Sequence, residues 1–240
     1  MATLYARELV KNFGNKKVVK GIDICVKQGE VVGLLGPNGA GKTTTFYMLV
    51  GIIKPTQGTV FIDDLEITSW PLHRRAKHGL SYLPQESSIF KKLSVRQNLQ
   101  IIFEYTSLTR KEQAKKMDML LDKLGITRLA DQKAAFLSGG ERRRLEIARA
   151  MIQEPKFILL DEPFAGIDPL AVDDIQQIIL SLRTMGIGVL ISDHNVRETL
   201  NICDRASIVY SGRSILDGTP EEIVRDPKAR KIYLGEDFRL

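Results

Sequence analysis

Residues 36–43 read Gly-Pro-Asn-Gly-Ala-Gly-Lys-Thr, which places three glycines, a lysine and a hydroxyl in the order GxxxxGK[ST]. Glycines in this order let successive backbone N–H groups turn inward and cradle phosphates at a helix N-terminus. Lys42 would then reach the β- and γ-phosphates, while the Thr43 hydroxyl would ligate Mg²⁺. The apolar run 31–35 precedes the motif and helix-forming residues 44–50 follow it, as a phosphate loop requires. The predicted phosphate-binding residues are Gly36, Pro37, Asn38, Gly39, Ala40, Gly41, Lys42, Thr43 and Thr44.

Two adjacent carboxylates, Asp161 and Glu162, follow the apolar run 157–160. A buried strand that ends in two acids suits metal chemistry at the edge of a sheet. Asp161 is predicted to hold the Mg²⁺ shell, and Glu162 to polarise an attacking water. By itself such a pair is more often solvated or caps a helix, but the phosphate loop favours the functional interpretation.

The signature segment, residues 137–141, reads Leu-Ser-Gly-Gly-Glu and forms a capping box at the start of a helix. Two glycines in a first turn cost about 1 kcal/mol each relative to alanine, so a function is expected to offset them. A helix N-terminus with bare amides is a second anion site. Two complementary phosphate-binding pieces in one chain suggest that two chains share each nucleotide. The residues predicted to contact it are Ser138, Gly139, Gly140 and Glu141.

These segments need a sheet that brings them to one edge, and the chain alternates accordingly. Residues 1–70 are rich in short strand patterns, and 188–192 form another wholly apolar run. Asp168-Pro169 opens a helix that extends to about Met185, and 208–216 read as a hairpin. We therefore expect an α/β P-loop fold with a mainly parallel sheet that is covered on both faces and an antiparallel β subdomain.

The middle of the chain changes character. Ser94 and Thr109 each begin a capping box followed by helical periodicity. Residues 87–135 are therefore predicted to form a helical subdomain. Residues 1–86 and 136–240 would form the catalytic core of the same single domain.

Composition narrows the class of protein. The 240 residues carry a net charge of +6, yet the basic residues are scattered, with short clusters such as 142–144 that are expected to be solvated. No nucleic-acid partner is expected from that distribution. Cys25 and Cys203 lie far apart, which favours a reducing, cytoplasmic setting. No apolar run reaches about 18 residues, so any membrane role is expected to come through a partner.

The order and spacing of these motifs resemble the ATPase subunits of ABC (ATP-binding cassette) transporters across essentially the whole chain. The matching positions are 36–43, Gln85, 137–141, Asp161, Glu162, Asp168 and His194. The resemblance implies a P-loop fold of the ABC type and a head-to-tail homodimer with two ATP molecules at its interface. Each ATP would lie between one phosphate loop and the partner's signature helix.

The family pattern also implies individual roles. Gln85 would sense Mg²⁺ and transmit its state to a membrane partner, and His194 would contact the γ-phosphate in catalysis. Asp168 would line the dimer seam. Phe13 stands where an aromatic stacks on adenine, although tyrosine is more usual there. Phe90 lies in the segment that forms a groove for a short helix of the membrane subunit, although such an aromatic could instead be core.

Longer stretches resemble the ATPases of lipopolysaccharide (Lpt) exporters. They are 43–48, 82–86, 137–144, 161–166, 193–200 and the tail 233–240. This resemblance implies two transmembrane permease subunits of the LptF/LptG type. It also implies a place on the cytoplasmic face of the inner membrane and a role in extracting lipopolysaccharide for transport to the outer membrane.

Two alternatives stay open. ATPases of branched-chain amino-acid importers are similar around the phosphate loop, but the tail and the Asp168 loop are expected to fit them less well. Soluble ABC ATPases of DNA repair or translation usually have long insertions or two cassettes, which this chain lacks. A module that binds nucleotide without hydrolysing it is disfavoured by the presence of Glu162 and His194.

Overall fold

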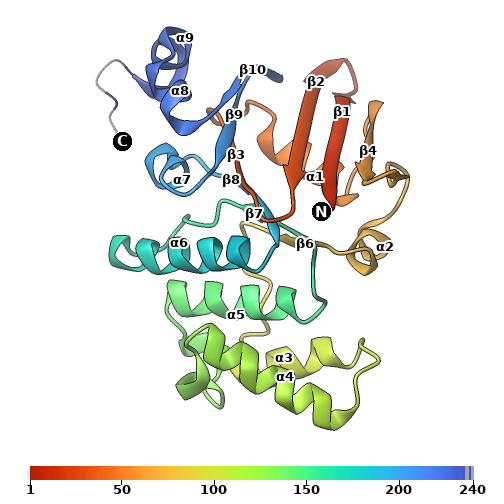
Figure 1. The fold of residues 1–240 in the computed structure, drawn as a ribbon, viewed down its shortest axis with the longest axis vertical. Helices are drawn as coiled ribbons and strands as arrows, with labels where there is room; N and C mark the ends of the chain where they lie inside the picture. The colour runs from red at the N-terminus through yellow and green to blue at the C-terminus, as the bar shows by residue number, and fades with distance from the viewer. Residues whose placement is uncertain (236–237, 239–240) are drawn as a thin grey trace.

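The computed structural model describes residues 1–235 and 238, except for the side chain of Leu170. A six-stranded sheet forms its centre (Figure 1). In spatial order its strands are β10 (Arg213–Gly218), β9 (Arg205–Tyr210), β3 (Val31–Leu35), β8 (Gly188–Ser192), β7 (Phe157–Asp161) and β6 (Leu80–Leu83). All pairs are parallel except the β9–β10 hairpin. The predicted mainly parallel sheet and hairpin are confirmed.

A second, antiparallel sheet covers one face of the first. Its strands are β2 (Lys16–Lys27), β1 (Thr3–Phe13), β4 (Gln57–Ile62) and β5 (Leu65–Glu66). Helix α1 (Lys42–Val50) follows the phosphate loop and shares one hydrophobic core with both sheets. Because β3, β7 and β8 are thus covered on both faces, they consist entirely of buried residues.

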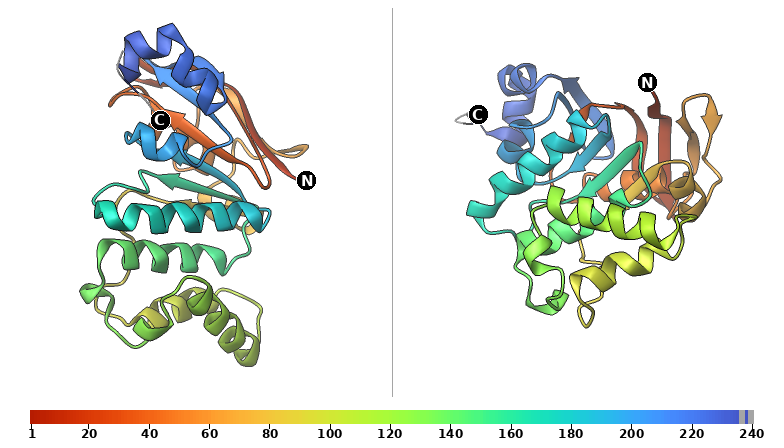
Figure 2. Two further views of the ribbon diagram at one scale, coloured as in Figure 1. Left: turned by 60° about the vertical axis from the view of Figure 1, so that its left-hand side comes forward. Right: turned by 60° about the horizontal axis from the view of Figure 1, so that its bottom comes forward.

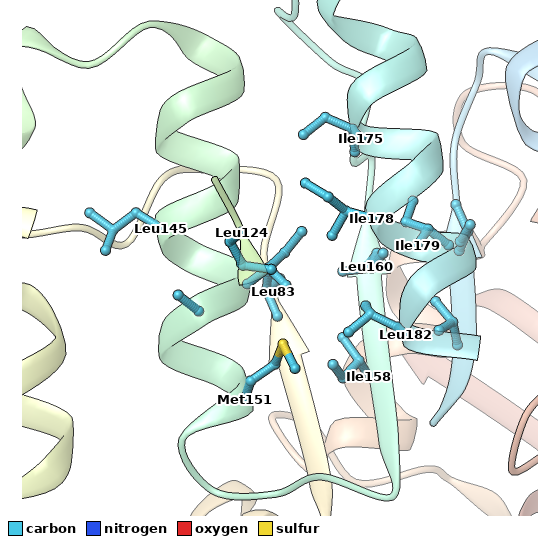
Figure 3. Packing of buried hydrophobic residues seen from close by; sticks show 14 of the residues in the cluster. Leu83, Leu124, Leu145, Met151, Ile158, Leu160, Ile175, Ile178, Ile179 and Leu182 are labelled. Carbon is cyan, nitrogen blue, oxygen red and sulfur yellow. The ribbon is translucent and has the colours of Figure 1, made fainter. Parts of the chain in front are cut away.

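Helices pack on the other face of the central sheet. Figure 3 shows Ile158 and Leu160 of β7 beside the isoleucines and Leu182 of α6 (Pro169–Thr184). Met151 of α5 (Gly139–Met151) lies on the same side, whereas Leu145 projects from the other side of α5. Helix α7 (Val196–Leu200) covers β3. As predicted, α6 begins at the proline directly after Asp168.

The helical region lies at the end of the molecule opposite the C-terminal helices (Figures 1 and 2). It contains α3 (Val95–Phe103), α4 (Arg110–Lys123) and the short 3₁₀ turns Thr127–Leu129 and Ala134–Phe136. Both predicted capping boxes form, at Ser94 and at Thr109. The helices share their core with α5, so the signature helix joins this region to the rest of the chain.

The C-terminal part contains α8 (Pro220–Arg225), α9 (Pro227–Ala229) and a final turn, Arg230–Leu234. The tail that supports part of the sequence resemblance lies partly outside the described residues, at 236–237 and 239–240. No helix in the described part of the chain is long and apolar enough to cross a membrane.

Helix α2 (Leu72–Lys77) holds α1 at the end away from the phosphate loop. Arg75 is almost wholly buried and donates to the carbonyls of Met48 and Leu49, which are near the C-terminus of α1. Those carbonyls lack partners within the helix, and the positive charge faces the negative end of its dipole. Burial lowers the pKa of Arg75 to about 10. The guanidinium therefore fixes the helix that carries the phosphate loop.

Candidate nucleotide site

The predicted chemical residues gather at the carboxyl edge of the parallel strands. The phosphate loop follows β3, Gln85 follows β6, Asp161 ends β7, and Asp193-His194 follow β8. Strands β6, β7 and β8 pair in register, with β3 next to β8. Loops that leave parallel strands at one edge form the usual binding crevice of such sheets.

The phosphate loop surrounds its own lysine. Lys42 is only 6% exposed, and its Nζ donates to the carbonyls of Gly36 at 2.6 Å and Pro37 at 3.1 Å. Gly41, with φ 108°, precedes α1 in a conformation that favours glycine. A Cβ on Gly36 would lie 2.1 Å from the Val209 carbonyl oxygen, so only glycine fits there. A pocket of about 140 Å³ opens beside the loop, lined by Val18, Asn38, Gly39, Gly41, Lys42, Thr43, Thr44 and Glu162.

The buried position of Lys42 disfavours the protonated, charged form of its side chain. Burial lowers the pKa of Lys42, and the carboxylates of Glu162, Asp161 and Asp193 raise it again in part. Its present partners are backbone carbonyls, which carry only partial charges. Phosphate oxygens in the pocket would replace them with full negative charges and so favour the protonated lysine.

Asp161 offers an oxygen to a cation. Its side chain is buried, and this burial raises the pKa of Asp161. Oδ2 accepts a hydrogen bond from the Tyr82 hydroxyl at 3.4 Å, whereas the buried Oδ1 has no hydrogen-bond partner among the described residues. Burial also raises the pKa of Tyr82 well above its usual range, so this hydroxyl stays a donor.

These donors fit Mg²⁺. A carboxylate oxygen and the hydroxyl of Thr43, in the first turn of α1, are hard oxygen ligands. The described residues contain no group of three or more His, Cys, Asp or Glu side chains that could hold a metal alone. Mg²⁺ typically binds to one or two carboxylates together with substrate phosphates, so it does not need such a group.

Three predicted residues meet at one oxygen of Glu162. Its Oε2 accepts a hydrogen bond from Gln85 Nε2 at 2.7 Å and lies 3.3 Å from His194 Nδ1. The backbone of Glu162 has a φ of 47°, which is rare for a residue with a side chain. Its N–H donates to the Ser192 carbonyl at 2.6 Å and holds this conformation. The arrangement aims a carboxylate into the pocket beside Lys42, where it could polarise a water.

Asp193 was not assigned a role from the sequence. It is wholly buried, and burial raises the pKa of Asp193. Its oxygens accept the N–H groups of Asn195 at 2.7 Å and Phe164 at 3.1 Å. It therefore ties the loop after β7 to the loop that carries His194. A polar residue directly after the buried run 188–192 was the available signal.

The signature segment lies apart from this pocket. Ser138 is exposed at the start of α5, and its hydroxyl accepts the Glu141 N–H at 3.2 Å to complete the predicted capping box. None of residues 138–141 is among the described residues that line the pocket beside Lys42. Gly139 instead lines a second pocket of about 110 Å³ together with Gln85 and Glu162. Within one chain the signature segment therefore lies near the Glu162 carboxylate but does not line the pocket at the phosphate loop.

The two signature glycines also have a packing reason. A Cβ on Gly139 would lie 3.2 Å from the carbonyl oxygen of Gly166, and one on Gly140 would lie 3.3 Å from the Cβ of Ala171. Small residues therefore let the segment around Asp168 pack closely on α5. Sequence reasoning attributed the cost of these glycines to anion binding alone.

A polar pair behind the signature segment corrects one expectation. Arg143 is 6% exposed, not solvated, and donates to Glu146 Oε2 at 3.0 Å and to the Pro84 carbonyl at 3.3 Å. It thereby links α5 to the residue before Gln85. The sequence did not single out Arg143, because it stands between two other arginines. Adjacent residues of a helix point in different directions, so one of the three can be buried.

The remaining predicted residues lie on the surface. Asp168 is exposed, immediately before α6. Phe13 is 51% exposed at the end of β1, and Phe90 is 46% exposed beneath the guanidinium of Arg149 at 5.4 Å. Neither aromatic is a core residue. Both are available to a ligand or partner, which is a necessary condition for the roles that the family pattern implies.

The chain is similar to known proteins over its whole length. It is 54% identical over 241 residues to the lipopolysaccharide export system ATP-binding protein LptB of Escherichia coli (strain K12), covering 100% of both chains. It also resembles the ADP conformation of MJ1267, an ATP-binding cassette of an ABC transporter, with a TM-score of 0.89, 32% identity and coverage of 98% of this chain and 100% of that one. A dimeric post-hydrolysis state of the ATP-binding cassette MJ0796, bound to ADP and Pi, matches with a TM-score of 0.78, 25% identity and coverage of 90% and 98%.

Family models match two parts of the chain. The model described as branched-chain amino acid ATP-binding cassette transporter matches residues 213–239. The tail therefore resembles that group too, so the expectation that it fits that group less well is not supported. The model described as ABC transporter matches residues 19–165. The chain belongs to the ABC transporter family, and it is an ATPase subunit that closely matches LptB.

Proposed function

We propose that this chain is the ATPase subunit of a lipopolysaccharide exporter. Two copies would sandwich two Mg²⁺-ATP and drive a pair of transmembrane permease subunits of the LptF/LptG type. The observation that carries the cargo assignment is the 54% identity to an LptB over the full length of both chains. Solved ABC cassettes match over nearly the whole chain as well, but at only 32% identity.

The phosphate loop would bind the triphosphate through its amides and Lys42. In the nucleotide complex, Lys42 Nζ would exchange the carbonyls of Gly36 and Pro37 for the β- and γ-phosphates. Thr43 and Asp161 would hold Mg²⁺, which neutralises charge on the phosphates when bound. Phe13 would stack on the adenine.

Glu162 would act on the attacking water. A water beside Oε2 would donate to this carboxylate, which is held by Gln85 from one side and His194 from the other. Because Gln85 and His194 come from different loops, both loops must be in place before Glu162 is aimed correctly. Asp193 would keep the His194 loop attached to the loop after Glu162.

A second copy would complete each site. Within one chain Ser138 is exposed and does not line the pocket beside Lys42. Ser138 of the partner subunit would supply a hydroxyl and a helix N-terminus to the γ-phosphate. Gly139, Gly140 and Glu141 would support that end, and Asp168 would lie at the seam.

The membrane partners would bind beside Phe90. Its ring is exposed next to a cation, and its backbone is fixed by Asn98, which accepts the Phe90 N–H at 2.8 Å and donates to its carbonyl at 3.1 Å. A rigidly held aromatic suits an interface anchor. Residues 87–135 would then be the subdomain that receives the permease helix, and the protein would sit on the cytoplasmic face of the inner membrane through that contact.

Import of branched-chain amino acids is the second candidate, because residues 213–239 match that group. The test is co-expression with each permease pair, followed by affinity purification and reconstitution in proteoliposomes. The proposal expects a stable complex with LptF/LptG-type permeases and ATP-dependent release of lipopolysaccharide from the vesicles. A complex only with amino-acid permeases, and uptake of those amino acids, would support the second candidate instead.

A further inference from the structure

Tyr82 lies next to the metal-binding carboxylate on the same face of the sheet. In the parallel pairing of β6 with β7, Tyr82 is opposite Leu159, and both pack into the core on the α1 side. Side chains alternate between the faces of a strand, so Asp161, two residues beyond Leu159, lies on this face as well. The neighbouring Leu83 and Leu160 belong to the core on the other face.

The ring of Tyr82 is held between two elements of the nucleotide site. Tyr47 of α1 meets it edge to face, with ring centroids 6.4 Å apart and an interplanar angle of 89°. Its hydroxyl donates to Asp161 Oδ2 at 3.4 Å. Tyr82 therefore contacts both the helix that follows the phosphate loop and the carboxylate at the end of β7.

This contact makes the two oxygens of Asp161 different. A carboxylate rotates broadly about its last torsion when nothing holds it. Here Oδ2 is engaged by Tyr82, whereas the buried Oδ1 accepts no well-formed hydrogen bond among the described residues. Burial raises the pKa of Asp161, and the Ser192 side chain, which is opposite Asp161 on β8 and is the other polar group at this carboxylate, lowers it in part. We infer that Tyr82 is a positioning residue that holds Oδ2 of Asp161 so that Oδ1 is oriented for Mg²⁺. The inference rests on the proposed function, since that cation is part of it.

The hydrogen bond from Tyr82 to Asp161 is long, so it is better suited to orient the carboxylate than to stabilise the fold. At 3.4 Å it is longer than the usual 2.5–3.0 Å of O–H···O bonds, so its loss should change the stability of the free protein little. Gln85, three residues further along the chain, donates to Glu162 in the same way that Tyr82 donates to Asp161. One strand and its loop thus hold both acids, with separate donors.

The test compares Tyr82→Phe with Tyr47→Phe. Each variant loses one hydroxyl and keeps its ring. The two hydroxyls contact each other, but only the first variant loses a donor to Asp161. Thermal melts of the full chain with a non-hydrolysable ATP analogue are followed across a Mg²⁺ titration, and metal-free binding of the analogue is measured in EDTA. We expect Tyr82→Phe to raise the Mg²⁺ midpoint about three- to tenfold, which is the range for loss of one ordinary hydrogen bond and suits a bond as long as this one. Tyr47→Phe should leave the midpoint unchanged, and both variants should keep metal-free binding.

The outcomes separate this inference from the proposed function. An unchanged midpoint in Tyr82→Phe, or an equal rise in Tyr47→Phe, would overturn the positioning role. A lower melting temperature of Tyr82→Phe without any nucleotide, together with an unchanged midpoint, would make the residue structural only. If the wild type showed no dependence on Mg²⁺, the metal assignment itself would fail, and the inference with it.

Discussion

The two segments proposed to bind phosphate, the loop at 36–43 and the start of α5, are built in opposite ways. Around the loop, Lys42, Asp161 and Asp193 are charged groups held in the interior, with pKa values shifted by burial. At α5, Ser138 is exposed and its capping box with Glu141 is closed within the helix. The phosphate loop forms a pocket lined by residues of its own chain, whereas Ser138 at the start of α5 faces the solvent. This division is what a site completed by a second copy requires.

The largest effect is expected at the buried part. Glu162→Gln keeps the shape of the side chain but removes its negative charge, so ATP hydrolysis should fall about 10²–10⁴-fold while ATP still binds. The intact ATP should then hold two chains together. Turnover assays and size measurement with Mg²⁺-ATP check both points. A variant that binds ATP but stays monomeric would contradict the shared site.

A surface outside both parts should behave differently. Phe90→Ala should leave the melting temperature and ATP binding nearly unchanged, because the ring is half exposed. Truncation of an aromatic anchor costs about 2 kcal/mol or more, so binding to the permease pair should weaken about thirtyfold. A pull-down with a parallel melt measures this. Loss of ATP binding together with several degrees of melting temperature would show that Phe90 supports the fold instead.

The exposed part can be tested with a matched pair of substitutions. Aspartate and asparagine both cap helices well, so Ser138→Asp and Ser138→Asn should preserve α5. Only the aspartate places a negative charge where the γ-phosphate is expected. It should weaken the ATP-dependent dimer at least about tenfold, or roughly 1.4 kcal/mol, relative to the asparagine variant. Equal dimer formation by the two variants would place the phosphate elsewhere.

A smaller effect is expected on the stability of the nucleotide-free protein, because the charged form of Asp161 is buried. Burial raises the pKa of Asp161 in the folded state, so the folded chain binds this proton more tightly than the unfolded chain. Its contribution to stability is therefore lost as pH rises from about 3.9, the unfolded value, through the raised folded value. The asparagine of Asp161→Asn does not ionise, so this variant does not lose stability at this position as the pH rises.

Without nucleotide, Asp161→Asn should consequently melt a few degrees above the wild type at neutral pH, since 1 kcal/mol corresponds to about 2–4 °C in a domain of this size. The gap should close below about pH 4, where the wild-type carboxyl is protonated in both states. Melting curves across pH measure the gap. A variant less stable than the wild type at pH 7 would mean that Asp161 is net stabilising in its charged form.

Local patterns predicted the parts of the site that depend on neighbouring residues. The phosphate loop, the acids after 157–160 and the capping box at Ser138 each follow from a few adjacent side chains, and the apolar runs placed them on one sheet edge. The helix starts at Ser94 and Thr109 were predicted for the same reason.

Features that depend on distant contacts were not predicted. Arg75 and Arg143 stand in basic stretches typical of a surface, yet the fold buries both against carbonyls from other segments. Tyr82 and Asp193 acquire their contacts only when separate strands meet. The tail is less specific than expected for another reason, because residues 213–239 also match the model of branched-chain amino acid transporters.

The claim that two chains form each site is tested most directly by mixing two inactive variants. Lys42→Ala disables the phosphate loop but keeps α5, and Ser138→Asp does the reverse. A mixed dimer would contain one intact site, made of the Ser138→Asp chain's loop and the Lys42→Ala chain's helix. At an ATP concentration where each variant alone is nearly inactive, we predict that an equal mixture recovers up to about one quarter of the wild-type ATPase rate, since random pairing restores one site in four. A mixture no more active than its separate components would contradict the shared site.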